Sequence, residues 1–184
     1  MKKIINRMKV AIGFIMFLWI MHFVGILFLP IIDFRQYGIV PRTMHGLIGI
    51  FFSPFIHRNI SYLISNTIGL ILPMVMLFSY EKKAFRIILL IILLGGFGTW
   101  LIGGDASHIG ASGLIYGLVG YLIFWGIFQR NIWSVLVSIF ALYLFIGIIP
   151  TLFVAPPSVS WSGHVCGFIA GIIIAKLTTK KLIK

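Results

Sequence analysis

Acidic residues are scarce in this chain of 184 residues. There are three, Asp33, Glu81 and Asp105, against fifteen lysines and arginines. None lies inside a long apolar run, which excludes an aspartyl protease with paired aspartates in the membrane. No H-E-x-x-H segment occurs, so a zinc metalloprotease of that type is also excluded. We therefore expect no metal and no cofactor.

Cysteine is nearly absent as well. Cys166 stands alone, so the chain cannot form an internal disulfide. It lies two residues after His164, which leaves a cysteine nucleophile as a minor alternative to be tested.

Charge of either sign is sparse, and apolar residues dominate. Charged residues are 10% and hydrophobic residues 60% of the chain, with a mean hydropathy of +1.12. This composition is typical of an integral membrane protein. Six apolar runs of roughly 18–22 residues could each cross about 30 Å of hydrocarbon as a helix. We predict an all-α membrane protein whose single domain, residues 1–184, has spans at 10–29, 59–80, 87–104, 111–128, 132–149 and 158–175.

The basic residues are unevenly placed about these spans. Twelve of the fifteen fall on the side of the two chain termini, and Arg35, Arg42 and Arg58 fall on the other. The positive-inside rule then places both termini in the cytoplasm. The formal charge of +12 is explained by anionic lipid and not by nucleic acid, since no basic patch is interleaved with exposed aromatics. A compact, basic, cysteine-poor chain suits a bacterial inner membrane, with an organellar membrane as the alternative.

A serine and a histidine stand at the entrances of two spans. Ser112 lies in the Gly-Ala-Ser-Gly segment 110–113 before the fourth span, and His164 follows Ser162-Gly163 at the sixth. Both spans cross from outside to inside in the six-span topology, so both residues lie at the outer face. Asn66 is about 12 Å along the second span, which crosses in the same direction. The topology thus places a nucleophile, a base and an amide on one side of the membrane.

Glycines on the two spans permit close approach of their backbones. Small residues at helical spacing let transmembrane helices pack tightly. The turn into the fourth span is also eased by a glycine, and the free N–H groups at that helix start can stabilise an oxyanion. The glycines concerned are Gly110, Gly113, Gly117 and Gly120, and then Gly163, Gly167 and Gly171.

These motifs resemble the rhomboid intramembrane serine proteases over nearly the whole chain. The G-x-S-G motif ends at Gly113, and the H-x-x-G-x-x-x-G motif runs from His164 to Gly171. Tyr116 is similar to the family's tyrosine that packs beside the catalytic histidine. The chain is thus expected to form a six-helix rhomboid-like bundle.

The family's H-x-x-x-x-H-x-x-x-N segment is matched in part. His57 and Asn66 stand at its first histidine and its asparagine, and Tyr62 replaces the middle histidine. The first histidine is expected to tie down the loop before the second span. Tyr62 is either a third oxyanion donor, because a phenol carries an O–H, or a residue that only fills space at the interface.

The resemblance implies hydrolysis of peptide bonds by a Ser-His dyad. Ser112 would be the nucleophile and His164 the general base and then acid, with the oxyanion held by Asn66 and the Ser112 backbone N–H. The substrates would be single-span membrane proteins with small and helix-breaking residues near the outer face.

Residues 30–53 resemble the family's first loop, with an amphipathic run at 44–52. Trp161 and the proline pair at 156–157 suggest an anchor and a lid over the cleft.

Other interpretations stay open at this point. A catalytically weak or inactive rhomboid-like protein that binds membrane clients is motivated by Tyr62, and a small transporter is disfavoured by the lack of charges inside the spans. His57 and His108 are alternative bases at the outer face, and His22 is read as a packing residue.

Overall fold

The computed structural model describes residues 2–154 and 159–179, and this part of the chain is almost entirely helical. The α-helices are α1 Lys2–Phe28, α2 Met44–Phe52, α3 Ile60–Tyr80, α4 Ala84–Ile102, α5 Ser112–Gln129, α6 Ile132–Phe145 and α7 Trp161–Thr179. Three short 3₁₀ segments join them, η1 Phe34–Tyr37, η2 Ser53–Phe55 and η3 Ile146–Leu152.

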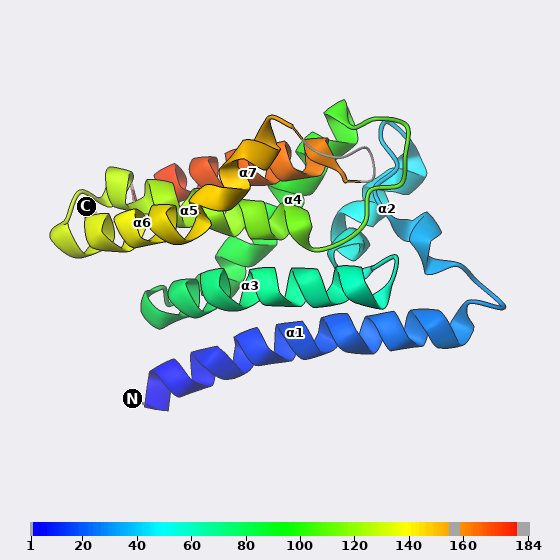
Figure 1. Cartoon of the computed structure of the whole chain (residues 1–184), viewed down its shortest axis with the longest axis horizontal. Coiled ribbons are helices and arrows are strands. Elements are labelled where there is room, and N and C mark those ends of the chain that lie inside the picture. The colour runs from blue at the N-terminus through cyan, green and yellow to red at the C-terminus, as the bar shows by residue number, and fades with distance from the viewer. Residues whose placement is uncertain (1, 155–158, 180–184) are drawn as a thin grey trace.

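Six of these segments are long and apolar enough to cross a membrane within the described residues. They are α1, α3, α4, α5, α7 and the continuous stretch of α6 and η3 over Ile132–Leu152. The start of α1 and the end of α7 lie at the same end of the bundle (Figure 1). The predicted all-α, six-span fold class is confirmed, and the cytoplasmic placement of the termini stays a prediction. Residue 158, the expected start of the last span, lies outside the described residues.

Local sequence fixes where several helices begin and end. The Asn59 side chain accepts the backbone N–H of Tyr62 and caps α3, and Asn131 with Ser134 forms a capping box at α6. The turn between α5 and α6 is closed by Arg130 in the left-handed conformation at φ 57°. Pro73 lies inside α3, where neighbouring helices shield the backbone that it leaves unpaired.

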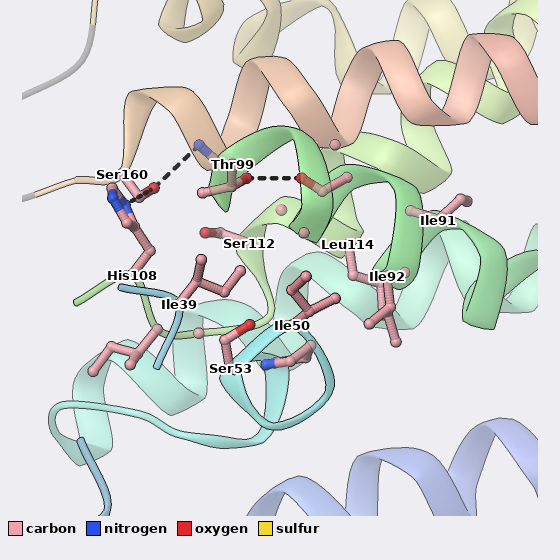
Figure 2. Close-up of a pocket in the computed structure, with 18 residues that line it drawn as sticks. Ile39, Ile50, Ser53, Ile91, Ile92, Thr99, His108, Ser112, Leu114 and Ser160 are labelled. Carbon is pink, nitrogen blue, oxygen red and sulfur yellow. Dashed lines mark hydrogen bonds between the residues drawn. The ribbon is translucent and has the colours of Figure 1, made fainter. Parts of the chain in front are cut away.

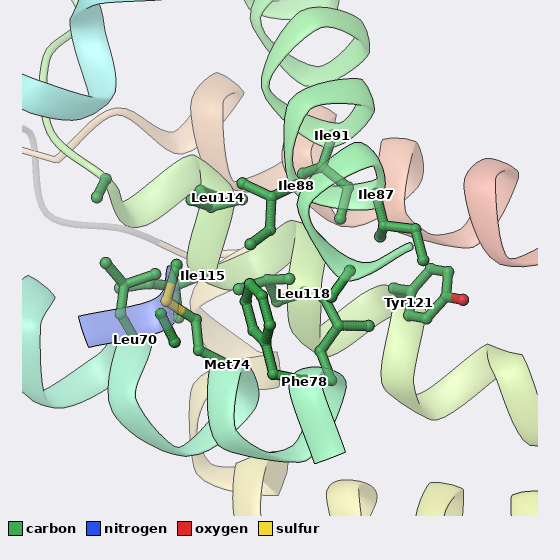
Figure 3. Close-up of a cluster of buried hydrophobic side chains, with 14 of the residues drawn as sticks. Leu70, Met74, Phe78, Ile87, Ile88, Ile91, Leu114, Ile115, Leu118 and Tyr121 are labelled. Atoms are coloured by element: carbon green, nitrogen blue, oxygen red, sulfur yellow. The ribbon is translucent and has the colours of Figure 1, made fainter. Parts of the chain in front are cut away.

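Helix α5 is the centre of the bundle. It packs on α7, α6, α3 and α4, and most of its side chains are buried. Figure 3 shows the apolar cluster on one of its sides. The cluster joins Leu70, Met74 and Phe78 of α3, Ile87, Ile88 and Ile91 of α4, and Leu114, Ile115, Leu118 and Tyr121 of α5.

The contact between α5 and α7 is made backbone to backbone. A Cβ added to Gly167 would lie 2.9 Å from the carbonyl carbon of Gly113, and one added to Gly120 would lie 2.5 Å from the carbonyl oxygen of Phe168. A Cβ on Gly171 would meet the carbonyl of Gly117. Neither helix has room for a side chain along this line.

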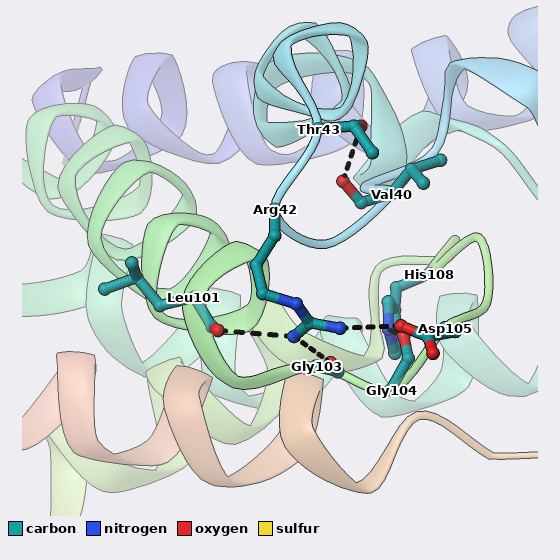
Figure 4. Close-up of polar contacts among 8 residues, drawn as sticks. All are labelled: Val40, Arg42, Thr43, Leu101, Gly103, Gly104, Asp105 and His108. Carbon is teal, nitrogen blue, oxygen red and sulfur yellow. Dashed lines mark hydrogen bonds and ion pairs between the residues drawn. The ribbon is translucent and has the colours of Figure 1, made fainter.

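The expected amphipathic run at 44–52 is helix α2, which packs on α4. Its preceding loop is held by Arg42, whose Nη1 donates to the Gly103 carbonyl at 2.7 Å and whose Nη2 contacts Asp105 at 2.6 Å (Figure 4). The Trp100 indole N–H also donates to the Thr43 carbonyl at 2.8 Å. These contacts join the first loop to the end of α4 and to the loop that leads into α5.

Replacing Gly171 by alanine should destabilise the protein strongly. The new methyl group would collide with backbone atoms of α5, which cannot move aside as a side chain can. Overpacking of this kind costs about 1–3 kcal/mol or more. Thermal unfolding in detergent would measure the loss. Gly147→Ala is the matched control, since a Cβ at Gly147 meets no atom within 4 Å; equal melting temperatures of the two variants would contradict the contact.

Candidate active site

The loop that leads into α5 is fixed from two sides. Its His108 pairs with Ile39 of the first loop through two backbone hydrogen bonds of 2.9 Å. The Gly110 N–H donates to the Ser53 carbonyl of η2 at 2.8 Å. Gly110 has φ +101°, a conformation that side chains rarely adopt, and a Cβ there would lie 2.6 Å from Cζ of Tyr62. This glycine therefore sets how the chain turns into α5.

Ser112 is the first residue of α5 and lines a cavity of about 50 Å³ (Figure 2). The other polar side chains of this cavity come from four other segments, and the rest of its wall is formed by apolar side chains and by glycines. These polar side chains are Ser53, Thr99, His108 and Ser160. The N-cap residue of α5, Ala111, makes no side-chain capping bond, so the N–H groups of the first turn of α5 lack this usual partner within the described part of the chain.

Tyr62 contacts the Ser112 hydroxyl directly. The two hydroxyl oxygens are 3.3 Å apart, and the Tyr62 hydroxyl also lies 3.1 Å from the Ile109 carbonyl. A phenol has one hydrogen, and a carbonyl can only accept. Tyr62 therefore donates to Ile109 and Ser112 donates to Tyr62. The residue that replaces the family's histidine touches the expected nucleophile.

His164 lies in the first turn of α7 and is 5% exposed. Its ring stacks on Tyr116, with ring centroids 4.0 Å apart and planes 17° apart. The Thr151 hydroxyl donates to the Ile148 carbonyl at 2.6 Å, so the Tyr116 hydroxyl donates to Thr151. The imidazole plane is thus held through Tyr116 by η3.

The structure contains no hydrogen bond between Ser112 and His164. Neither ring nitrogen of His164 has a partner among the described residues. Gly113, next to Ser112, and Gly163, next to His164, lie close together, since a Cβ on Gly113 would lie 3.1 Å from the Gly163 carbonyl oxygen. The two side chains therefore emerge from adjoining turns of packed helices. The serine is turned toward Tyr62, and His164 does not line the Ser112 cavity.

Asn66 is almost fully buried, one turn beyond Tyr62. Its Nδ2 donates to the Tyr62 carbonyl at 2.8 Å, and its Oδ1 has no partner among the described residues. An amide has two N–H hydrogens, so one remains for a ligand. Asn66 does not line the Ser112 cavity, and this arrangement contains no hydrogen bond from it to Ser112.

His57 and His22 line a second cavity, of about 80 Å³. The His57 ring centroid is 5.5 Å from that of Tyr62, and both histidines are buried. Burial lowers the pKa of His57 to about 4, so its ring is neutral near pH 7. The His57 ring packs against the Tyr62 ring and does not line the Ser112 cavity.

His108 joins the loop before α5 to the start of α7. Its Nδ1 is 2.7 Å from the Ser160 hydroxyl and its Nε2 is 3.1 Å from the Gly104 carbonyl. Ser160 in turn accepts the Gly163 N–H at 3.1 Å. Burial lowers the pKa of His108, which keeps the ring neutral with Nε2–H donating to Gly104 and Nδ1 accepting from Ser160. Both nitrogens are engaged, so His108 is poorly suited to act as the base.

Sequence reasoning missed Ser160 and Thr151, which lie in connecting segments with no motif. The alternative nucleophile Cys166 is buried and does not line the Ser112 cavity. Trp161 is fixed by donating its indole N–H to the Leu152 carbonyl at 2.5 Å, while the proline pair of the expected lid lies outside the described residues. No group of three or more histidine, cysteine or acidic side chains suited to a metal occurs in the part of the chain that the structure describes.

These features define a polytopic membrane protein with a serine at a helix start and a histidine on the helix packed against it. The Rhomboid domain family model matches residues 44–181, and the chain belongs to the rhomboid family. It is 38% identical over 153 residues to Uncharacterized protein Rv1337 of Mycobacterium tuberculosis, covering 76% of this chain and 62% of that protein. It is 36% identical over 140 residues to Uncharacterized protein ML1171 of Mycobacterium leprae, covering 70% and 55%. The chain thus spans less than two thirds of the length of these relatives.

Replacing Gly110 by alanine should destabilise the loop before α5. The substitution combines a positive φ with a collision against the Tyr62 ring, and a non-glycine residue in such a conformation costs about 1–3 kcal/mol even without a collision. Thermal unfolding in detergent measures the effect. Gly104→Ala, in the same loop with no atom within 4 Å of its Cβ, should be nearly neutral. A Gly110→Ala protein as stable as the Gly104→Ala protein would refute this role.

Proposed function

We propose that this protein is an intramembrane serine endopeptidase that cleaves transmembrane or membrane-adjacent segments of single-span membrane proteins. One observation carries the proposal. Ser112 begins α5 beside a partly polar cavity, and His164 emerges from the adjoining turn of α7 with its ring held by Tyr116. Membership of the rhomboid family supports the same reaction class.

In the proposed reaction, His164 removes the Ser112 proton while Ser112 attacks the scissile carbonyl. The Ser112 hydroxyl must first leave Tyr62 and turn toward His164, because it is bonded to Tyr62 in the resting arrangement. Catalytic hydrogen bonds are often long or misaligned before substrate binds. His164 then protonates the leaving amine, and water attacks the acyl-enzyme with His164 again as base.

The oxyanion would be held by backbone and side-chain donors. The uncapped first turn of α5 supplies the Ser112 N–H, and Asn66 has one N–H hydrogen to spare. Tyr62 could add a third donor if its hydroxyl turned from the Ile109 carbonyl toward the oxyanion. This set of donors needs no acidic residue and no metal.

The basic residues support an orientation with both termini in the cytoplasm and the Ser112 cavity toward the outer face. Mycobacterial relatives support a bacterial cytoplasmic membrane as the location.

One observation favours a second candidate function. Tyr62 accepts the Ser112 hydroxyl hydrogen, which keeps it from His164. A rhomboid-like protein with weak or no catalysis, which binds membrane clients in the same cavity, would tolerate such a contact. Labelling of Ser112 by a fluorophosphonate or isocoumarin probe separates the two, because a client-binding protein without an activated serine would not react.

Ser112→Ala and His164→Ala should each abolish cleavage of a reconstituted single-span substrate while the fold is kept. The two residues act as one unit, so each loss should approach the loss in the double variant. Product formation in liposomes, mapped by mass spectrometry, is the measurement. Ser65→Ala and His45→Ala are matched controls on exposed positions. His57→Ala and His108→Ala should be milder than His164→Ala, and turnover by either dyad variant would disprove the assignment.

Tyr62 can be assigned by three variants on one substrate. If Tyr62 donates to the oxyanion, Tyr62→Phe should lower turnover about 10²-fold, as removal of one such donor does. If it only holds Ser112 in the resting state, Tyr62→Phe should be silent or raise turnover, while Asn66→Ala still lowers it. A gain on Tyr62→His would identify the natural protein as a weakened protease. An unchanged rate in Asn66→Ala would remove Asn66 from the oxyanion site.

A further inference from the structure

An apolar groove separates α1 from α4 on the side of the bundle away from α7. Helix α1 packs on α3 and touches η2, and it makes no extensive contact with α4. The space between them is about 480 Å³ and is lined only by apolar residues and one glycine. The α1 wall is Val10, Gly13, Phe14 and Phe17, the α4 wall is Phe85, Ile88, Leu89 and Ile92, and Phe51 and Phe55 complete the lining.

The groove runs along the two helices. Each wall repeats at i, i+3, i+4 and i+7, so it is one continuous helical face of about 10 Å in length. Phe55 of η2 lines the groove and packs on Phe14 and Phe17 of the α1 wall, with ring centroids 5.5 and 5.0 Å away. Starting near one membrane surface, this length crosses most of one hydrocarbon leaflet, which is about 15 Å thick.

Basic residues flank one end of the groove. Val10 and Phe85 mark it, near the starts of α1 and α4, and these helices cross the membrane in the same direction as the first and third spans. Lys9 and Arg86 adjoin those two residues in sequence and are exposed, and Lys82 and Lys83 precede α4. Glu81 is the acidic residue at this end, and its carboxylate accepts the Lys83 N–H.

We propose that this groove binds one anionic phospholipid, with an acyl chain between α1 and α4 and the headgroup phosphate at Lys9 and Arg86. A dry cavity of about 150 Å³ holds one benzene, so a groove of three times that volume has room for a segment of an acyl chain. Basic side chains at a membrane surface attract anionic headgroups. An acyl chain and a phosphate, at opposite ends of one molecule, match the two features of the site.

The bound lipid would stabilise the segment that carries the candidate active site. Phe55 belongs to η2, whose Ser53 carbonyl holds the Gly110 N–H, and Ile92 lines both the groove and the Ser112 cavity. An acyl chain in the groove would contact Phe55 and so hold η2 in place. Binding itself does not depend on the proposed protease activity, so binding and stability are the readouts of the test.

Gly13 offers a direct way to fill the groove. A Cβ at Gly13 meets no atom within 4 Å, so Gly13→Leu should place a side chain where the acyl chain lies without disturbing the helices. Gly147→Leu is the matched control, since that position is equally open and lies in η3, outside the groove. Leu89→Phe narrows the groove from the α4 wall and serves as a second blocking variant.

The experiment uses the purified, delipidated full chain with phosphatidylglycerol or phosphatidylcholine, read by native mass spectrometry and thermal unfolding. We expect one phosphatidylglycerol per chain and a melting temperature raised by about 5 °C at a hundredfold excess over Kd. Gly13→Leu and Leu89→Phe should lose both effects and Gly147→Leu should keep them. Lys9→Gln combined with Arg86→Gln should reduce the preference for phosphatidylglycerol at least tenfold.

Three results would overturn the proposal. Equal binding of the two lipids by the wild-type chain would show that the basic end recognises no headgroup. Unchanged phosphatidylglycerol binding by both Gly13→Leu and Leu89→Phe would place the lipid elsewhere. A dimer of the wild-type chain that Gly13→Leu dissociates would show that a second copy occupies the groove instead.

Discussion

The direct contact of the α5 and α7 backbones is the constraint on which the rest of the structure depends. In a bilayer the helices gain little from hiding apolar side chains, because lipid is equally apolar. Close packing therefore has to come from surfaces without side chains, and the glycines of α5 and α7 supply them. The contact begins at Gly113 and Gly163, each next to one member of the proposed dyad. In each helix, the first packing glycine and the residue of the proposed dyad therefore lie in the same first turn.

A second set of contacts orients the residues at the helix ends, Ser112 and His164. Glycine faces set the distance between two helices but not the orientation of the side chains at their ends. Stacking on Tyr116 sets the plane of His164, and Tyr116 is held by Thr151. At the nucleophile, the Gly110 N–H bond to Ser53 sets the path of the chain into α5. Each partner of the proposed dyad is therefore oriented by a segment other than its own helix.

The sequence predicted the features that arise from local patterns. Long apolar runs located the spans, glycine spacing located the helix contact, and the amphipathic run located α2, because each pattern is complete within one segment. The contact of Tyr62 with Ser112 and the bridge from His108 to Ser160 each join segments about fifty residues apart. Such contacts follow from the paths of loops, which residue periodicity does not specify. The empty space beside Gly13 was equally hidden, because it depends on how far α1 stands from α4.

Tyr62 shows how one substitution in a family motif alters a resting site. A histidine at that position could accept or donate with either ring nitrogen, whereas a phenol has one hydrogen and gives it here to the Ile109 carbonyl. The remaining lone pairs make Tyr62 an acceptor toward Ser112, so the serine hydrogen is directed away from His164. In the proposed reaction this hydrogen bond has to break before the Ser112 hydroxyl can turn toward the imidazole. The resting position of the Ser112 hydroxyl therefore depends on the loop before α5, which presents the Ile109 carbonyl to Tyr62, and not on the dyad itself.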